Sequence, residues 1–442
     1  MPNPRKVLII SPNFPPINVP DHHRIRMALP YLAEFGWKAD VLTVHSAWVE
    51  GVIEPALLGT LPADLTVIKT GALPLKITRR VGLGSLALRA MPFFYKEGNL
   101  LLRTKKYDLV FFSTTAFPVM ALGPLWKKNF GVEYVLDFQD PWLNDYYKIN
   151  RPSVPPGGRF KYGLSRFLAR RLEPFAMRGV SHVISVSPEY PKTFLVRYPW
   201  LRNDQFTVLP FGAADNDFQR LEDLKIRNVM FDSSDGRQHW VYVGRGGKDM
   251  AFALRCLFTA IHLKRYEEPK KYGNLVLHFI GTDYASGNMA RKTVEPIAVE
   301  CGVGDMVHEH PHRIPYFEAL QCLMDADALI VPGSDDPGYT ASKIYPYILA
   351  KKPLLAVFHE KSSVVNLLRT TKAGTVVTFN KDYSIDRVAA EIIHKWFADF
   401  PPARPQTDWQ AFEPYSAREM TRRLCEIFDK CVIFNSDGTD NK

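Results

Sequence analysis

The sequence has few cysteines and lacks segments that would direct a chain into or across a membrane. Its five cysteines, an odd number in 442 residues, form no CxxC pair and no metal-ligand spacing, which favours a reducing compartment. The apolar stretch at residues 7–10 is too short for a signal peptide. The longest uncharged run, Leu109–Trp126, contains Pro118 and Pro124, which would break a spanning helix. We therefore expect a cytoplasmic protein.

Two common nucleotide-binding motifs are also absent. Gly244-Arg-Gly-Gly247 follows an apolar run, but a GxGxxG fingerprint would need glycine where the chain has Asp249. A phosphate-binding loop that ends at Lys248 would need glycine where the chain has Tyr242. The sequence also contains no GxSxG nucleophile elbow. The motifs of NAD-dependent enzymes, P-loop enzymes and serine hydrolases of this type are therefore missing.

One motif match is misleading. Residues 308–312, His-Glu-His-Pro-His, satisfy the HExxH pattern of zinc proteases. That chemistry requires both histidines on one face of a helix, and Pro311 opposes a continuous helix. We predict neither a metal site nor a resident cofactor.

Positive charge is concentrated in two segments. The chain has 56 Lys and Arg against 46 Asp and Glu, a formal net charge of +10. Residues 76–106 hold eight basic residues and one acidic residue, and residues 150–178 hold seven and one, so the remainder is net acidic. In the first segment, apolar residues such as Leu83 and Leu100 alternate with the basic residues. The pattern fits either a solvated helix pair or a surface that docks on anionic lipid at the inner face of the cytoplasmic membrane, and we expect no nucleic-acid partner.

Short apolar runs alternate with helical patterns along most of the chain. One predicted helix covers residues 25–35 and ends at Gly36. Buried parallel strands are predicted at residues 6–10, 39–44, 109–112, 134–138, 182–187, 206–209, 240–243, 275–280, 328–331, 353–358 and 375–378. This rhythm predicts an α/β fold of two Rossmann-like, doubly wound parallel-sheet domains.

A polar stretch interrupts the rhythm and places the domain boundaries. We predict an N-terminal domain over residues 1–211 and a linker over residues 212–238. A second domain over residues 239–400 follows. A C-terminal segment and closing helix over residues 401–434 would pack back toward the N-terminal domain, and residues 435–442 would form a tail.

Glycine and charged residues follow two strands of the second predicted domain. Gly244 to Lys248 follow the strand at 240–243, and a Gly/Ser/Thr-rich stretch at residues 332–343 follows the strand at 328–331. Ligands of open α/β sheets bind at the carboxyl ends of strands. Helix N-termini and backbone amides bind phosphate. Arg245 and Lys248 are therefore candidates to stabilise a diphosphate leaving group without a metal.

Six short motifs occur in an informative order. They are Ser11-Pro-Asn-Phe-Pro-Pro16, Ser113-Thr-Thr-Ala-Phe-Pro118, Asp137-Phe-Gln-Asp-Pro-Trp142, Val208-Leu-Pro-Phe-Gly-Ala-Ala-Asp215, Tyr242-Val-Gly-Arg245 with Lys248, and Ser342-Lys-Ile-Tyr-Pro-Tyr-Ile-Leu-Ala-Lys-Lys-Pro353. Together they resemble the family 4 retaining glycosyltransferases of the GT-B fold, particularly the polysaccharide-type members. The resemblance covers nearly the whole chain.

The resemblance implies transfer of a sugar from a nucleotide-diphosphate donor to a hydroxyl of a glycan, a lipid-linked acceptor or a small molecule, with retention and without metal. It implies catalytic roles for Arg245 and Lys248 at the diphosphate and for Asp140 in positioning the acceptor. The implied donor-binding residues are Gly244, Gly246, Gly338, Tyr339, Thr340, Ser342 and Lys343. The implied acceptor-binding residues are Asn13, His22, Arg24 and Thr114.

The chain departs from the family pattern at several positions. Gly338 and Pro346 stand where the family's paired glutamates usually occur, the second of which holds the nucleotide ribose. Gln139 replaces the arginine of the family's DFRDPW motif, and the spacing between Arg245 and Lys248 is shorter than usual. The alternative function is a GT-B protein that binds a nucleotide sugar or a glycan without turnover. Donor binding without transfer to any acceptor would distinguish it.

Overall fold

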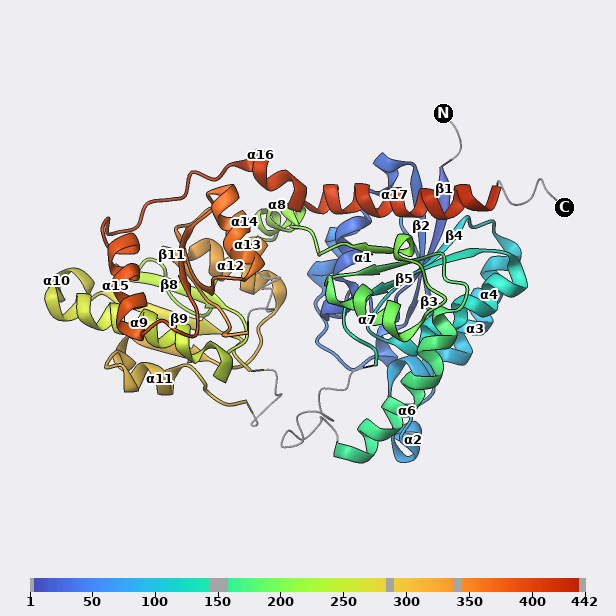
Figure 1. Ribbon diagram of the computed structural model, residues 1–442, viewed down its shortest axis with the longest axis horizontal. Coiled ribbons are helices and arrows are strands. Elements are labelled where there is room, and N and C mark those ends of the chain that lie inside the picture. Colours follow the sequence, from blue (N-terminus) through green and yellow to red (C-terminus); the bar gives the residue numbers. More distant parts are fainter. Residues whose placement is uncertain (1–3, 144–157, 284–289, 337–343, 437–442) are drawn as a thin grey trace. The chain divides into compact units, whose positions relative to one another are not determined.

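The computed structural model describes residues 4–143, 158–283, 290–336 and 344–436. The chain divides into two compact units (Figure 1). The first comprises Met1–Gly212 together with Ala417–Lys442, and the second comprises Ala213–Ser416. Among the helices in the described ranges, none is long and apolar enough to cross a membrane.

The first unit is built on a seven-stranded parallel sheet with the order β3-β2-β1-β4-β5-β6-β7. Its strands are β1 (Arg5–Ile10), β2 (Trp37–Val44), β3 (Thr66–Thr70), β4 (Leu109–Ser113), β5 (Glu133–Phe138), β6 (His182–Ser185) and β7 (Phe206–Val208). Strands β4 and β5 are buried along their whole length, as is most of β1. Burial on both faces explains why these strands are nearly continuous apolar runs in the sequence.

Helices cover both faces of this sheet. They are α1 (His23–Ala28), α2 (Leu75–Thr78), α3 (Leu86–Thr104), α4 (Leu122–Phe130), α6 (Gly158–Met177), α7 (Glu189–Arg197) and α17 (Ala417–Ser436). Phe112 packs with α3 and α4, whereas its neighbour Phe111 packs with α1 and α17 on the opposite face. In Figure 1, α17 runs past the strands of this unit as the last, red helix.

The predicted helix over residues 25–35 is divided into two shorter helices. Helix α1 ends at Ala28, and the 3-10 helix η2 covers Leu32–Phe35. Pro30 lies between them and cannot donate the backbone hydrogen bond that a continuous helix requires. The predicted end at Gly36 is confirmed, because this residue adopts a φ of 79°, which glycine tolerates without strain.

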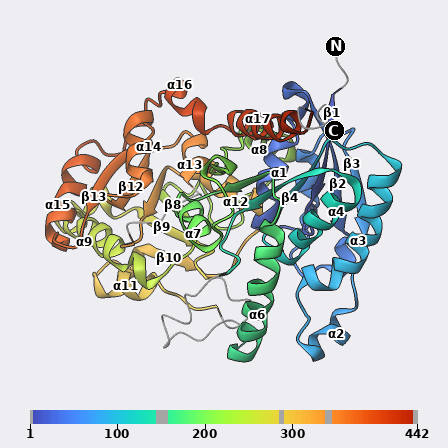
Figure 2. The ribbon, with the colours of Figure 1, turned by 45° about the vertical axis from the view of Figure 1, so that its right-hand side comes forward.

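The second unit is built on a six-stranded parallel sheet with the order β10-β9-β8-β11-β12-β13. Its strands are β8 (Gln238–Val243), β9 (Leu275–Ile280), β10 (Val307–His310), β11 (Ala328–Pro332), β12 (Leu354–His359) and β13 (Thr375–Phe379). Its helices are α8 (Asp215–Leu224), α9 (Ala251–Glu267), α10 (Pro269–Tyr272), α11 (Glu295–Glu300), α12 (Tyr316–Asp325), α13 (Ile344–Leu349), α14 (Ser363–Thr371), α15 (Ile385–Trp396) and α16 (Trp409–Phe412). Helices α9 and α15 pack together beside this sheet (Figure 2).

The unit boundaries differ from those expected from the sequence. The segment expected as a linker, residues 212–238, contains α8, and Tyr316 of α12 donates a hydrogen bond to Asp217 of α8 at 2.6 Å. Apart from Gly212, this segment therefore belongs to the second unit. The C-terminal segment also divides, because Ala213 and Ser416 form a β-bridge within the second unit, and α17, which begins at Ala417, lies in the first.

Candidate functional site

A buried polar cluster lies at the carboxyl ends of β1, β4 and β5. Ser113, the last residue of β4, is the register partner of Asp137 on β5. Asp137 Oδ2 accepts hydrogen bonds from Arg24 Nε at 2.7 Å, Ser113 Oγ at 2.8 Å and Gln139 Nε2 at 3.0 Å. The side chains of Arg24 and Asp137 are completely buried. This ion pair therefore fixes α1 to the carboxyl end of β5.

The second half of the cluster is centred on Asp21, in the 3-10 helix η1 (Pro20–His22). Asp21 Oδ2 accepts from Asn13 Nδ2 at 2.9 Å and from Thr114 Oγ1 at 3.1 Å. Burial raises the pKa of the Asp21 carboxyl, and the hydrogen bonds from Asn13 and Thr114 oppose that shift. Asp21 therefore connects the segment after β1 with the segment after β4.

Gln139 joins the two halves of the cluster. Its Nε2 donates to the main-chain oxygen of Asp21 at 3.0 Å and also to Asp137 Oδ2. Arg24 already supplies the positive charge that Asp137 requires. A neutral amide at position 139 can donate to the Asp21 main-chain oxygen and to Asp137 without adding a second buried guanidinium, which fits the departure from the DFRDPW motif.

The structure brings the expected acceptor-binding residues together, but most of them are inaccessible. His22, Arg24 and Thr114 are 0% exposed, whereas Asn13 is half-buried. His22 Nε2 bonds the main-chain oxygen of Ile17 at 2.7 Å. The three buried residues therefore act on a ligand only through the neighbours that they position, and Asn13 is the member of this set that reaches the surface.

Asp140 follows Gln139 directly and is an exposed carboxylate beside this cluster. The surrounding chain nevertheless removes enough water to raise the pKa of its carboxyl above the ordinary value. Burial, with a contribution from the charge of Asp140, raises the pKa of Tyr190 to about 12, so the two groups interact. Asp140 is accessible to a ligand and is a stronger base than an ordinary aspartate.

At the carboxyl end of β8, Arg245 is held in a bidentate ion pair. Its Nη1 and Nη2 donate to Asp249 Oδ1 at 3.0 Å and Oδ2 at 2.5 Å. Hydrogen bonds from Arg245 lower the pKa of Asp249. The Asp249 main-chain oxygen accepts from the amide of Asp335 at 2.8 Å, which connects the loops after β8 and β11. The guanidinium is thus oriented at the strand ends while 24% of the Arg245 side chain stays exposed.

The neighbouring glycines and Lys248 differ in accessibility. The amides of Gly244 and Gly246 donate to the main-chain oxygens of Ile280 at 2.9 Å and Thr282 at 2.6 Å, so these amides do not face a ligand. A Cβ at Gly246 would lie 2.3 Å from Thr293 Oγ1, which explains the need for glycine. Lys248 is exposed and forms no ion pair within the described part of the chain.

The remaining donor-binding candidates lie in or next to a segment that is not described. Gly338, Tyr339, Thr340, Ser342 and Lys343 are outside the described residues. Pro346 lies in α13, next to Tyr347, whose hydroxyl accepts from the amide of Val243 at 2.7 Å and donates to its carbonyl at 2.9 Å. Tyr347 therefore fixes α13 beside the end of β8.

The HExxH match has a structural role. Residues His308 to His310 lie on β10, not on a helix. Glu309 accepts hydrogen bonds at 2.9 Å from three consecutive amides at the beginning of α11, those of Thr293, Val294 and Glu295. Its carboxylate therefore caps α11. In the portion of the chain with described coordinates, no group of three or more His, Cys, Asp or Glu is arranged to hold a metal ion.

Comparison with known proteins identifies the fold. No protein-family model and no curated sequence matches the chain. A glycosyltransferase from Rickettsia africae is similar with a TM-score of 0.55 at 14% identity, and the match covers 97% of this chain and 99% of that one. The Anabaena protein HepE in complex with UDP is similar with a TM-score of 0.51 at 14% identity, covering 98% of each chain. UDP-GlcNAc 2-epimerase from Methanocaldococcus jannaschii has a TM-score of 0.50 at 12% identity, covering 96% and 99%.

These similarities confirm the expected fold class. The chain has two parallel sheets flanked by helices, in the two-domain α/β arrangement of the GT-B fold. At identities of 12–14% the likeness establishes the fold alone. Proteins with different activities share it, so the function has to be argued from the site residues.

Proposed function

We propose that the protein is a glycosyltransferase that moves a sugar from a nucleoside-diphosphate donor to a hydroxyl acceptor. The observation that carries this proposal is the oriented Arg245, held by Asp249 at the carboxyl end of β8 and followed by the exposed Lys248. Strand ends of open α/β sheets are the usual ligand positions in such folds. An oriented guanidinium and a nearby exposed ammonium at this position suit a diphosphate.

The donor chemistry follows from these charges. As the bond between the sugar C1 and the diphosphate oxygen breaks, negative charge grows on the diphosphate. Arg245 and Lys248 stabilise that charge, and Asp249 keeps the guanidinium oriented before the donor arrives. Because two side chains supply the neutralising charge, the proposed transfer requires no metal.

The first unit supplies the acceptor residues in this proposal. Asp140, with its raised pKa, holds the acceptor hydroxyl, and Asn13 adds a polar contact at the same sheet edge. In a transfer with retention, the new bond between C1 and the acceptor oxygen forms on the face that the diphosphate leaves. The acceptor proton then passes to a diphosphate oxygen.

The second candidate function is binding of a nucleotide sugar or a glycan without turnover. It is favoured by Pro346, which puts no carboxylate at the position where a ribose-binding glutamate is expected. A protein of this kind would keep donor affinity through Arg245 and Lys248. It would transfer no sugar.

Calorimetric titration of the full chain tests the donor site. We expect one nucleotide among UDP, GDP, ADP, dTDP and CMP to bind with a micromolar dissociation constant, about −8 kcal/mol, equally with and without magnesium. Absence of binding to all five would refute the proposed donor site. Binding that requires magnesium would refute the metal-independent mechanism.

Product analysis separates the proposed activities. The matching nucleotide sugar, labelled in the sugar, is incubated with candidate acceptors, and products are separated by chromatography. Label on an acceptor supports transfer, and its anomeric configuration tests retention. Unchanged donor with retained binding supports the non-catalytic alternative, and an altered donor sugar would support epimerisation instead.

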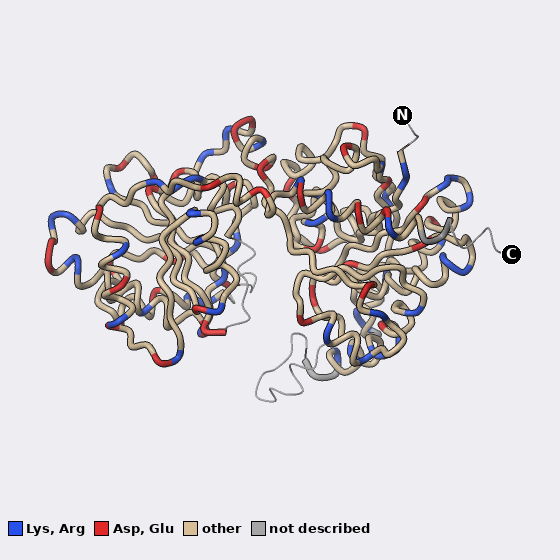
Figure 3. Tube along the Cα trace, turned by 45° about the horizontal axis from the view of Figure 1, so that its top comes forward, with Lys and Arg blue, Asp and Glu red and all other residues tan. Residues whose placement is uncertain are grey.

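We also propose that one end of the first unit docks on anionic membranes. A Cβ at Gly82, just after α2, would lie 3.0 Å from Leu164 Cδ2 of α6, so these segments are neighbours. Ile77 of α2 is 66% exposed and Phe167 of α6 is 56% exposed. The exposed basic residues around them are Lys76, Arg79, Arg80, Lys161, Arg170 and Arg171. Figure 3 shows Lys and Arg gathered at this end of the unit.

Substitution of three of these basic residues should weaken vesicle binding. In Lys76→Ala/Arg80→Ala/Arg170→Ala we expect a loss of about 3 kcal/mol, roughly 100-fold, because each such charge contributes about 1 kcal/mol near an anionic surface. Co-sedimentation with phosphatidylglycerol vesicles measures it. The control, Lys270→Ala/Lys271→Ala/Lys381→Ala, removes the same charge from exposed positions of the second unit. Equal losses in both triple variants, or binding to pure phosphatidylcholine, would contradict specific docking.

A further inference from the structure

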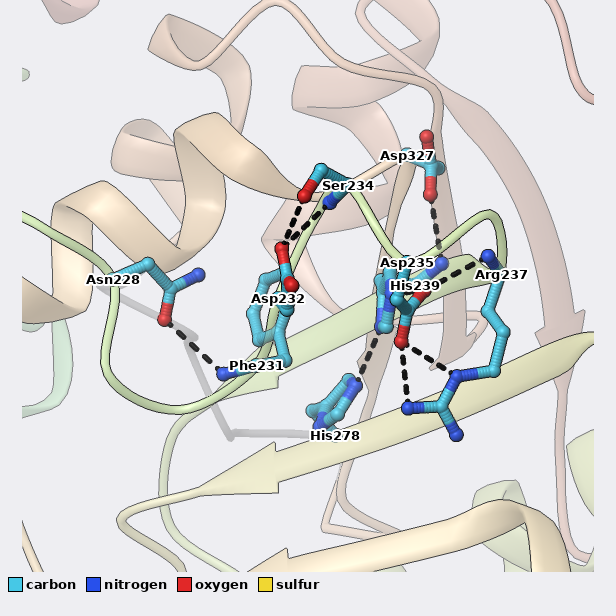
Figure 4. Close-up of polar contacts among 9 residues, drawn as sticks. All are labelled: Asn228, Phe231, Asp232, Ser234, Asp235, Arg237, His239, His278 and Asp327. Carbon is cyan, nitrogen blue, oxygen red and sulfur yellow. Dashed lines mark hydrogen bonds and ion pairs between the residues drawn. The ribbon is translucent and has the colours of Figure 1, made fainter.

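A pair of buried histidines lies in the second unit, away from Arg245. His239 of β8 is 0% exposed, and His278 of β9 is 7% exposed. His239 Nδ1 and His278 Nε2 are 2.9 Å apart, so the two rings share a hydrogen bond (Figure 4). Imidazole is the side chain whose charge changes most readily near neutral pH. The pair is therefore sensitive to added protons.

Residues 225–237, which we call the strap, cover this pair. The Phe231 ring stacks on His239 with the ring centroids 4.8 Å apart and on His278 at 4.6 Å. Asp235 Oδ1 lies 2.9 Å from His239 Nε2. As Figure 4 shows, one aromatic ring and one carboxylate attach the strap to the two imidazoles.

The hydrogen bonds limit how many protons the pair can carry. The Asp235 carboxylate only accepts, so His239 Nε2 carries a hydrogen, and one further hydrogen lies between His239 Nδ1 and His278 Nε2. A single added proton is tolerated, because either ring can donate across the shared bond. When both rings are protonated, two N–H groups face each other at 2.9 Å and the bond is lost.

The charges around the pair do not compensate for a second proton. Asp235 is already bonded to the amide of Arg237 at 2.9 Å and to its Nε at 2.7 Å. His308 of β10 stacks on His278 with the centroids 5.7 Å apart, and Asp327 binds the main-chain amide of His239, not its ring. Helix α12 contributes the neutral Cys322, which contacts Asn228 of the strap.

The protonation of His278 is correspondingly suppressed. Burial, followed by the neighbouring His239, lowers the pKa of His278 to about 3. An imidazole in water has a pKa of about 6.5. At a pH between these two values, His278 binds a proton when the strap is open but not when the strap is closed. The closed state is therefore fully favoured above about pH 6.5 and loses its advantage as the pH falls toward about 3.

We propose that the His239–His278 pair is an acid-sensitive latch, which holds the strap on the second sheet at neutral pH and releases it when both imidazoles are protonated. The proposal does not depend on the glycosyltransferase activity. It gives a second role to a segment whose composition alone indicates a linker. It also predicts which amides respond, since those of Phe231, Ser234 and Arg237 are hydrogen-bonded inside the strap.

Hydrogen–deuterium exchange of the full chain tests the latch. Exchange of strap peptides is followed from about pH 7.5 to about pH 4.5 and corrected for the intrinsic rate, because the titration begins at about pH 6.5. Because the closed pair accepts one added proton and excludes only the second, opening takes up one net proton, and in the wild type we expect the opening constant to rise by up to about tenfold per pH unit below that value. In His278→Gln, which keeps a hydrogen-bonding side chain but does not titrate, the opening constant should not change with pH. The control His394→Gln removes an exposed histidine of α15 and should keep the wild-type slope.

A second variant keeps the test decisive if His278→Gln does not fold. Phe231→Leu removes the stacking but leaves both histidines. Its strap should open more often at neutral pH and should keep the tenfold dependence. The proposal would be overturned if the opening constant of the wild-type strap did not change with pH. It would also be overturned if the opening constant still rose at low pH in His278→Gln.

Discussion

Replacement of Arg24 with leucine is expected to lower the free energy of unfolding of the first unit by about 3–5 kcal/mol, because it leaves the buried Asp137 carboxylate without its ion-pair partner. Arg24 also donates to the main-chain oxygen of Leu209 at 2.7 Å, and this bond is lost as well. Urea unfolding, followed by native-state exchange of amides in β4 and β5, measures the loss in the sheet that contains Asp137.

Two further variants identify the cause of that loss. Arg418 pairs with Glu34 at 2.8 Å with both side chains largely exposed, so Arg418→Leu should cost about 0–1 kcal/mol in the same unit. In Arg24→Leu/Asp137→Asn, the amide still accepts from Ser113 without carrying a charge, and a large part of the stability should return. An equal cost for Arg24→Leu and Arg418→Leu would show that the buried pair has no special role.

Substitution of Arg245 with alanine should weaken nucleoside-diphosphate binding about 10- to 150-fold, because hydrogen bonds to charged groups contribute about 1.5–3 kcal/mol. The side chain is held at the end of β8 by Asp249, so the wild-type arginine loses little freedom when it binds phosphate. Calorimetric titration with the nucleotide that binds the wild type gives the change directly.

The matched control for this variant is Arg265→Ala. Arg265 forms a bidentate pair with Asp305, with both N–O distances 2.7 Å, near the far end of α9. Both substitutions remove a guanidinium and break a bidentate pair within the second unit. Loss of affinity in Arg245→Ala alone assigns the phosphate contact to Arg245, whereas wild-type affinity in both variants would remove Arg245 from the donor site.

The apolar pattern of the sequence was sufficient to predict most strands of the two sheets, but not the two more polar edge strands β3 and β10. Strands β1, β4 and β9 are mostly or fully buried, so their residues are nearly all apolar and the strands are easy to recognise in the sequence. Strand β3 forms one edge of its sheet and is half-exposed, and β10 carries His308 and Glu309 on a short edge strand. Edge strands need only weak apolar character, so both were missed.

The candidate site was predictable in outline for a different reason. Parallel topology brings strand ends together, so the position of Arg245 after an apolar run already placed it at a sheet edge. Its partner Asp249 and the pairing of Asp137 with Arg24 depend on side-chain contacts that sequence spacing does not specify. The role of Asp21 could not be predicted from the sequence, because it depends on the burial of the carboxylate among Asn13 and Thr114.

Helix α17 has a consequence for the order in which the protein is made. It contributes Phe428 to the core cluster that contains Trp37 and Phe111, and Asp429 pairs with Arg5 at the beginning of β1. The second unit, Ala213–Ser416, is thus inserted between two parts of the first. A ribosome releases the complete second unit before it supplies the helix that covers the first sheet. During that interval α1 covers only part of the apolar face of β1 and β4, and the part that α17 later covers stays exposed to chaperones that bind apolar surface.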